Sequence, residues 1–144
     1  MTDVKDSAAR FVRAFNAHDE KAIRSHFDPT GTFEAPGGLK LSGTEAGTYA
    51  MGWIKACPDA KLSVRNELVS GPWVVDELKF EGTHQGPLAS PVGTIAPTGR
   101  KLVTSSVLII RYANDVAIET RLCFDQADVL SQLGALPMPV TAGV

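Results

Sequence analysis

The feature that most constrains the fold of this chain is a pair of strand-like runs between residues 102 and 125. The chain reads LVTSSVLIIRY, then AND, then VAIETRLCFD, so two runs rich in Val, Ile, Leu and Thr flank a short Asn-Asp turn. This pattern is typical of a long β-hairpin. Both faces of the first run are apolar, and such a strand must be covered on both sides. We therefore expect one face to meet the body of the domain and the other to meet a partner subunit or further structure.

The length and composition of the chain fit one compact domain. Its 144 residues are 44% hydrophobic and 21% charged, which is enough for one core and leaves no room for a second. We expect a single domain over residues 1–137 and a loose tail over residues 138–144. The net charge is −2, with acidic and basic residues mixed throughout, so the sequence has no basic stripe for nucleic acid or an anionic membrane. The expected partner is an uncharged or weakly charged small molecule.

The N-terminus and the cysteines indicate the cellular compartment. MTDVKDSAAR reads as a polar helix start rather than a signal peptide, and no apolar run approaches the roughly 20 residues that span a bilayer. We expect a cytoplasmic protein. Cys57 and Cys123 lack metal-ligand spacing. They predict two reduced, mostly buried thiols rather than a disulfide, and no metal site.

The order of the predicted elements indicates the fold class. Apolar residues at helical spacing predict helices over residues 3–16, 19–27 and 44–56, the third capped by Thr44, with a short strand over residues 31–35. Two antiparallel strands over residues 61–70 and 73–84 precede a Gly- and Pro-rich loop over residues 85–100, the hairpin, and a short helix over residues 125–133. Such a long loop favours a pocket lid or a subunit contact. We expect an α+β cone whose N-terminal helices pack on a strongly curved antiparallel sheet and enclose a pocket.

This order, together with several segments, resembles the nuclear transport factor 2-like cone and specifically the SnoaL-like polyketide cyclase family. The segments are FVRAFNAHDEKAIRSHFDPTGTFEAPGG, GWIKACPDAKL, FEGTHQGPL, PTGRKL and FDQADVLSQLGALP. The resemblance implies a pocket between the helices and the concave sheet, and an intramolecular aldol cyclisation without metal or other cofactor. The family's catalytic carboxylate, two histidines and three amide side chains fall, in that order, at Leu122, Leu108, Thr120, Ser106, Ala50 and Ala35. Because leucine cannot move a proton, the family mechanism does not carry over residue by residue.

The same alternation and resemblance predict which residues bind the ligand. The concave face should be apolar with two hydroxyl groups and aromatic walls, which suits a flat hydrophobic molecule. The alternative is that these residues only form the core. They are Phe15, Phe33, Trp53, Ser106, Leu108, Ile110, Thr120, Leu122 and Phe124.

Three ionisable residues are candidates for acid/base catalysis. Asp76 alternates with Val74 and Leu78 on the more apolar face of its strand, so desolvation should raise its pKa; it is the first choice, with a purely structural role as the alternative. His84 ends that strand, where capping or a place at the pocket rim explains it equally well. Asp125 precedes the last helix, and helix capping explains it better than catalysis. Asp76 and His84 lie too far apart along one extended strand to form a single catalytic pair without a bulge or a partner chain.

These observations give three functional hypotheses. The first is an enzyme of polyketide or related secondary metabolism that acts without cofactor on a hydrophobic, polyketide-like carbonyl substrate, through a cyclisation directed by shape or a hydroxylase-like step. The second is a non-catalytic protein that binds a hydrophobic small molecule, and the third is an adaptor that uses its sheet for protein contact. We also expect a homodimer, because Val103, Val107 and Ile109 would otherwise leave an apolar patch.

Overall fold

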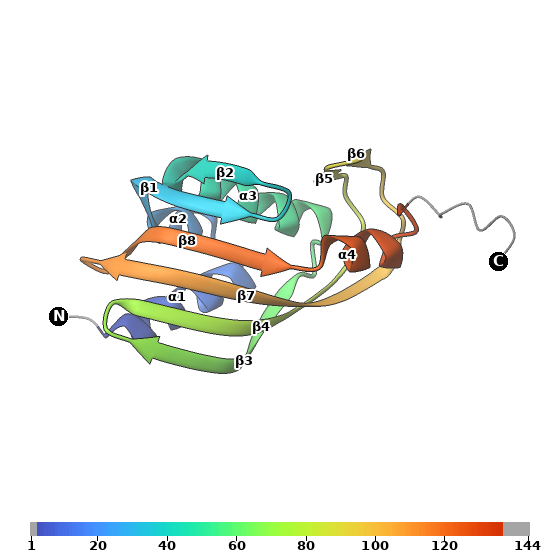
Figure 1. Cartoon of the computed structure of the whole chain (residues 1–144). Coiled ribbons are helices and arrows are strands. Elements are labelled where there is room, and N and C mark those ends of the chain that lie inside the picture. The colour runs from blue at the N-terminus through green and yellow to red at the C-terminus, as the bar shows by residue number, and fades with distance from the viewer. Residues whose placement is uncertain (1–2, 137–144) are drawn as a thin grey trace, which may run out of the picture.

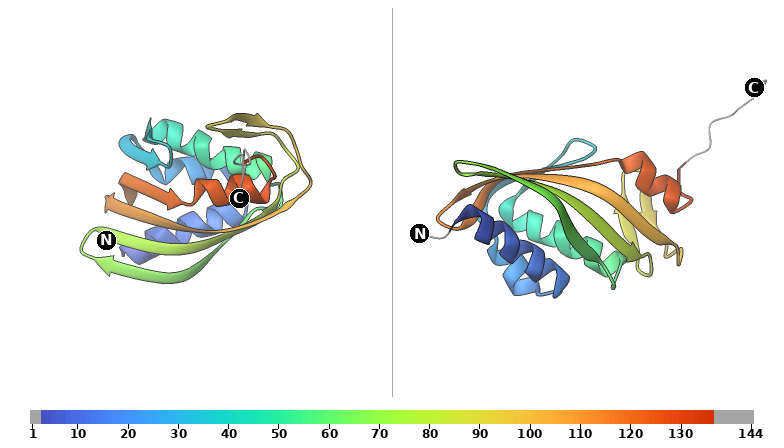
Figure 2. Two further views of the ribbon diagram at one scale, coloured as in Figure 1. Left: turned by 45° about the vertical axis from the view of Figure 1, so that its right-hand side comes forward. Right: turned by 90° about the horizontal axis from the view of Figure 1, so that it is seen from below.

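Six strands form one curved sheet, and three helices pack across its concave side in the computed structural model, which describes residues 3–136 (Figures 1 and 2). The helices are α1 (Val4–Asn16), α2 (Glu20–Ser25), α3 (Gly43–Ala56) and α4 (Gln126–Gln132). The strands are β1 (Phe27–Ala35), β2 (Leu39–Ser42), β3 (Lys61–Ser70), β4 (Trp73–Thr83), β5 (Leu88–Ser90), β6 (Gly93–Ile95), β7 (Lys101–Ala113) and β8 (Val116–Phe124). The predicted α+β architecture is confirmed, while the tail predicted over residues 138–144 lies outside the described residues.

The predicted hairpin is confirmed and lies at the centre of the sheet. The strand order is β2-β1-β8-β7-β4-β3, and β7 pairs with β8 through Leu108 opposite Leu122 and Ile110 opposite Thr120. Asn114 and Asp115 form its turn with φ angles of 50° and 66°. Positive φ at both turn residues matches the right-handed twist of the strands, which explains why an Asn-Asp pair suits this position.

The first half of the chain differs from the sequence prediction at several element boundaries. The helix expected over residues 19–27 ends at Ser25, and β1 begins at Phe27 and runs past Asp28 and Pro29. The register between β1 and β8 shifts between Phe27 and Thr32, and such a bulge tolerates a proline that cannot donate a ladder hydrogen bond. The short strand expected over residues 31–35 is part of the longer β1, which pairs with β2 and runs parallel to β8 of the predicted hairpin.

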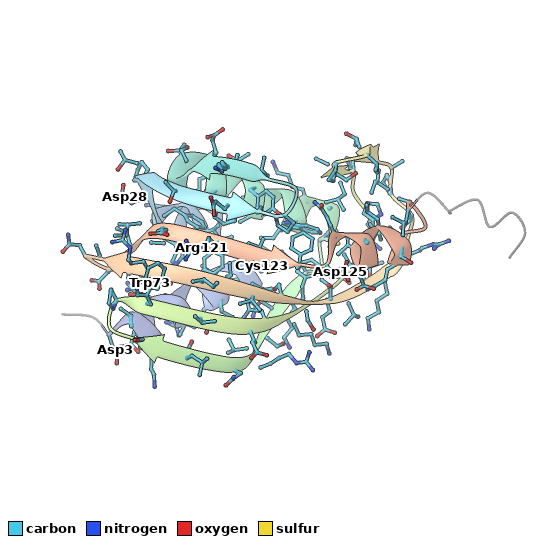
Figure 3. The ribbon with its side chains drawn as sticks, in the orientation of Figure 1. Asp3, Asp28, Trp73, Arg121, Cys123 and Asp125 are labelled. Atoms are coloured by element: carbon cyan, nitrogen blue, oxygen red, sulfur yellow. The ribbon has the colours of Figure 1, made fainter. Side chains whose placement is uncertain are left out.

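Three further expectations need correction. The third helix is capped by Ser42 rather than Thr44, because the Ser42 hydroxyl accepts from the Glu45 N–H at 3.2 Å and the Glu45 carboxylate accepts from the Ser42 N–H at 3.0 Å. The loop over residues 85–100 contains the small β5-β6 hairpin. Cys57 is buried as expected, but Cys123 is exposed, because it lies on the face of β8 turned away from the helices (Figure 3).

Two helices hold the cavity side of the sheet in place. The Asn16 side chain, at the end of α1, donates to the Leu62 carbonyl at 2.9 Å and accepts from the Leu62 N–H at 2.7 Å, which fastens α1 to β3. A Cβ on Gly43, the first residue of α3, would collide with the backbone carbonyl of Asp28, so only glycine lets α3 begin this close to β1. Phe11 and Phe15 of α1 are buried beneath the sheet, and each such side chain contributes about 1.5–3 kcal/mol.

The convex face of the sheet carries a mixed surface. Trp73 lies beneath the guanidinium groups of Arg111 and Arg121, at 5.7 and 5.6 Å, and Figure 3 shows Trp73 and Arg121 on this face. Val107 and Ile109 are half-buried there, and Val103 is 39% exposed. The predicted apolar strip therefore exists on this face, and the homodimer stays a prediction.

Candidate ligand-binding cavity

A cavity with a free volume of about 80 Å³ lies between the concave face of the sheet and the helices. All nine residues predicted from the sequence to bind ligand lie in its wall. The complete wall is Phe11, Phe15, His26, Phe27, Phe33, Tyr49, Ala50, Trp53, Leu62, Leu78, Phe80, Thr104, Ser106, Leu108, Ile110, Thr120, Leu122 and Phe124. The period-2 alternation of β7 and β8 explains this agreement for the six hairpin residues, because every second side chain of the hairpin points to the concave side.

The mouth of the cavity lies between α3 and β8. Tyr49, Trp53, Leu122 and Phe124 are half-buried, whereas every other wall residue is buried. Trp53 meets Phe124 edge to face, with ring centroids 5.6 Å apart. Ligand pockets usually hold about 300–1,000 Å³, so a polycyclic ligand would enter only if these mouth side chains rotate outward.

Most of the wall is aromatic or aliphatic, with a few polar atoms. Thr104 and Ser106 on β7 and Thr120 on β8 bring hydroxyl groups to the sheet side. Thr120 is 1% exposed, and its hydroxyl meets no hydrogen-bond partner among residues 3–136. A buried hydroxyl without a partner is costly. It marks a point where a polar atom of a ligand would be stabilised.

Among residues 3–136 the wall contains two ionisable side chains, Tyr49 at the mouth and His26, and the sequence analysis singled out neither. His26 is the buried one of the two. It follows α2 directly, and its Nε2 lies 2.8 Å from the hydroxyl oxygen of Tyr112 on β7. Burial, helped by the positive charge of Arg10, lowers the pKa of His26 to about 3, so its imidazole is neutral at physiological pH. In the sequence, the only indication was that His26 precedes the aromatic Phe27. Both residues fell within the helix predicted over residues 19–27, so His26 was not recognised.

Asp76 lies on the concave face, as predicted, but it is not part of the cavity wall. It is 1% exposed, and its neighbours on the adjacent strands are Leu108 of β7 and Glu67 of β3. Burial raises the pKa of Asp76 to about 7, and the nearby Glu67 carboxylate adds to the increase. Its Oδ1 meets no hydrogen-bond donor among the described residues. Leu108, which lies opposite Asp76 on β7, and Leu78, two positions along β4, both belong to the wall.

The other two candidate catalytic residues lie outside the cavity wall. His84 is buried beneath the loop after β4, where its Nδ1 accepts from the Thr98 N–H at 3.2 Å, and burial lowers its pKa. Asp125 is exposed and accepts from the Asp128 N–H at 3.0 Å as the N-cap of α4. The capping interpretation of Asp125 is therefore confirmed, and the structure does not bring Asp76, His84 and Asp125 together.

Two further properties concern metals and membranes. Within residues 3–136, no group of three or more His, Cys, Asp or Glu side chains is arranged to hold a metal ion. In the same part of the chain, no helix has both the length and the apolar character needed to cross a bilayer.

Comparisons with known proteins agree with this geometry. The family model described as SnoaL-like polyketide cyclase matches residues 6–133. No curated protein matches the sequence. Among solved structures, AclR of Streptomyces galilaeus, a candidate hydroxylase, is 25% identical to this chain with a TM-score of 0.78. The match covers 93% of this chain and 86% of the AclR chain.

Two more distant structures share the fold. IdmH of Streptomyces antibioticus, a candidate polyketide cyclase, is 22% identical with a TM-score of 0.77. The match covers 92% of this chain and 99% of the IdmH chain. A Catenulispora acidiphila protein with a ketosteroid isomerase-like fold, solved with trimethylamine, is 16% identical with a TM-score of 0.72. The match covers 91% of this chain and 93% of that protein. The predicted cone is thereby confirmed.

Proposed function

Because this chain belongs to the SnoaL-like polyketide cyclase family, we propose that it acts on a hydrophobic, polyketide-like carbonyl compound bound in the cavity, without a metal or other cofactor. The observation that carries this proposal is the composition of the wall, which combines aromatic and aliphatic side chains with four hydroxyls, that of Tyr49 included, and one neutral imidazole. Burying apolar surface contributes roughly 25 cal/mol per Å², so such a wall stabilises an extended ring system. The few polar groups would orient it.

The chemistry we propose is an intramolecular aldol ring closure directed mainly by shape. In this step a proton leaves a carbon next to a carbonyl group, that carbon bonds to a second carbonyl carbon, and the new alkoxide takes up a proton. No other reactant is consumed. Holding the two carbons in contact can supply much of the rate enhancement, because intramolecular reactions reach high effective concentrations.

Asp76 remains our first choice for the acid/base group, ahead of His84 and Asp125. Its pKa of about 7 lets the carboxyl group both accept and return a proton near neutral pH. Because Leu78 and Leu108 belong to the wall and Asp76 does not, this role requires a ligand or a water molecule to reach Asp76 past the wall side chains. General acid/base catalysis typically contributes about 10²–10⁴-fold, so Asp76→Asn should lower turnover by about 100-fold or more.

A non-catalytic binding protein is the second candidate. It is favoured by one observation: no carboxylate lies in the cavity wall among the described residues, and Leu122 stands where the family resemblance implies one. A hydroxylase-like step is a further alternative, supported by the 25% identity with AclR.

We also propose that the convex face forms a homodimer through Val103, Val107 and Ile109. A half-exposed apolar strip on a long central strand supports this proposal. The cytoplasmic location expected from the sequence remains a prediction.

Native mass spectrometry of the purified protein tests the ligand class, and incubation of the identified compound with the protein tests the reaction. Ring closure leaves the mass unchanged or removes one water, hydroxylation adds one oxygen, and a binding protein returns the compound unaltered. Activity that survives dialysis against a chelator supports the cofactor-free reaction, whereas activity that requires an added metal or nucleotide contradicts it. Recovery of only charged or nucleotide ligands would overturn the ligand class.

A further inference from the structure

His26 lies at the end of the cavity farthest from the Trp53–Phe124 contact. Phe27, the next residue, pairs with Ala117 near the start of β8, whereas Phe124 ends that strand. Phe124 lies seven positions after Ala117, which corresponds to about 23 Å of strand. A ligand that enters beside Phe124 would therefore bring its leading end to His26.

The His26 ring is held rigidly. Its backbone carbonyl accepts from the Ala117 N–H at 2.8 Å, and its ring lies among the rings of Phe11, Phe27 and Tyr112, at centroid distances of 4.5, 4.8 and 5.5 Å. It is 8% exposed. Tyr112 is fixed in turn, because its N–H donates to the Pro72 carbonyl at 2.9 Å. The rings of His26 and Tyr112 therefore belong to one packed aromatic cluster.

The hydrogen bonds around His26 assign its proton. A neutral imidazole has one donor nitrogen and one acceptor nitrogen. Burial, together with the negative charges of Asp76 and Glu67, raises the pKa of Tyr112, so its hydroxyl keeps its proton. Among residues 3–136, Nε2 of His26 is the only hydrogen-bond partner of that hydroxyl.

Two tautomers are then possible. If Nε2 carried the proton, both the Tyr112 hydroxyl proton and the Nδ1 lone pair of His26 would stay unpaired. If the Tyr112 hydroxyl donates to Nε2, only the Nδ1–H remains without a partner, and Nδ1 is indeed buried and unpartnered among the described residues. The second arrangement leaves fewer buried polar groups unsatisfied and is therefore preferred.

We propose that the Nδ1–H of His26 donates a hydrogen bond to an oxygen acceptor, a carbonyl or enolate oxygen, at the leading end of the ligand, and that Tyr112 holds this donor in place. The inference rests on the proposed function and specifies how that ligand is oriented. A neutral imidazole can polarise a carbonyl and stabilise an enolate without giving up its proton. Tyr112 acts as a positioning residue through His26.

His26 also forms part of a second, more polar cavity between α1 and α2. Arg10, Arg13, Ser25 and Asp115 are among its wall residues. Its Nδ1–H could serve that space instead, and the experiment must separate the two possibilities. A pair of probes that differ by one oxygen does so: 1-indanone has a ketone, and indane has the same ring skeleton without it.

The test is an NMR titration that measures the dissociation constants of both probes. Asparagine at position 26 keeps an N–H donor near the place of Nδ1, whereas glutamine keeps an amide near the place of Nε2 and loses that donor. We expect His26→Gln to lower the affinity ratio of ketone to hydrocarbon by roughly 3- to 10-fold, as the loss of one hydrogen bond requires. His26→Asn should keep the ratio within about 2-fold. The control is His18→Asn, at a histidine that bonds the Ala60 carbonyl outside the cavity.

The outcomes separate the inference from the function on which it depends. An unchanged ratio in His26→Gln, with both probes still bound, overturns the inference and leaves the cavity as a ligand site. Failure of wild-type protein to bind either probe overturns the function and the inference together. Tyr112→Phe should give a mixture of His26 tautomers in ¹⁵N spectra, which a purely structural tyrosine would not produce. If the position 26 variants do not fold, the carbonyl stretch of 1-indanone bound to wild type decides: it should lie below its value in hexane, and an equal value refutes the hydrogen bond.

Discussion

Replacing Asp76 by asparagine should make the protein more stable, and by an amount that depends on pH. The side chain is 1% exposed, its Oδ1 lacks a donor among residues 3–136, and the Glu67 carboxylate faces it across the β3–β4 pair. Burial and Glu67 raise the pKa of Asp76 from 3.8 to about 7 in the folded protein. Asparagine has nearly the same shape and cannot ionise.

The sign of the effect follows from where the proton is held. Between pH 4 and pH 7 the folded protein keeps a proton that the unfolded chain has released, so stability is highest below about pH 4 and is lost as the pH rises through 7. The pKa difference, from 3.8 to about 7, is about three units. At 1.36 kcal/mol per unit, the wild type loses up to about 4 kcal/mol that Asp76→Asn retains.

Urea unfolding at intervals from pH 4.5 to pH 8 measures this difference. The stability advantage of Asp76→Asn should grow by about 1.4 kcal/mol per pH unit up to about pH 7 and then level off. Glu67→Gln is the matched control, because it removes one cause of the raised Asp76 pKa. The loss of stability between pH 4.5 and pH 7 should therefore be smaller in this variant than in the wild type. A stability difference that does not change with pH would refute the reasoning, because Asp76 would then ionise normally in the folded state.

Three other predictions follow from the cavity, the convex face and the helix cap. Leu108→Asp and Leu122→Arg should each abolish the rise in melting temperature caused by a tricyclic ligand such as anthraquinone, and unchanged binding in both folded variants would contradict the wall assignment. Val107→Glu should give monomers or aggregates in sedimentation, whereas wild-type protein that sediments as a monomer at micromolar concentration would argue against the dimer. Asp125→Asn should cost at most about 1 kcal/mol in urea unfolding and leave turnover unchanged, since asparagine still caps α4; a large loss of turnover would restore Asp125 as a catalytic candidate.

The wall of the cavity was largely predictable from the sequence. Strict alternation along the hairpin determines which side chains share a face, and this places Ser106, Leu108 and Ile110 on the same face as Thr120 and Leu122. The same period placed Asp76 on the buried face of its strand. Alternation is a property of neighbouring residues, and each run carries it without reference to the rest of the chain.

The polar end of the cavity could not be predicted in this way. His26 and Tyr112 are 86 residues apart in the sequence. Their hydrogen bond depends on the parallel pairing of β1 with β8, which no local sequence pattern predicts. The sequence pattern predicted a helix over residues 19–27 and a strand only from residue 31, whereas β1 begins at Phe27. The free volume and the mouth depend likewise on how α3 seats against β1 through Gly43. The sequence by itself therefore determined the faces of the strands and the chemistry they carry, whereas only tertiary packing decided which polar groups meet, because that depends on the path of the chain through distant elements.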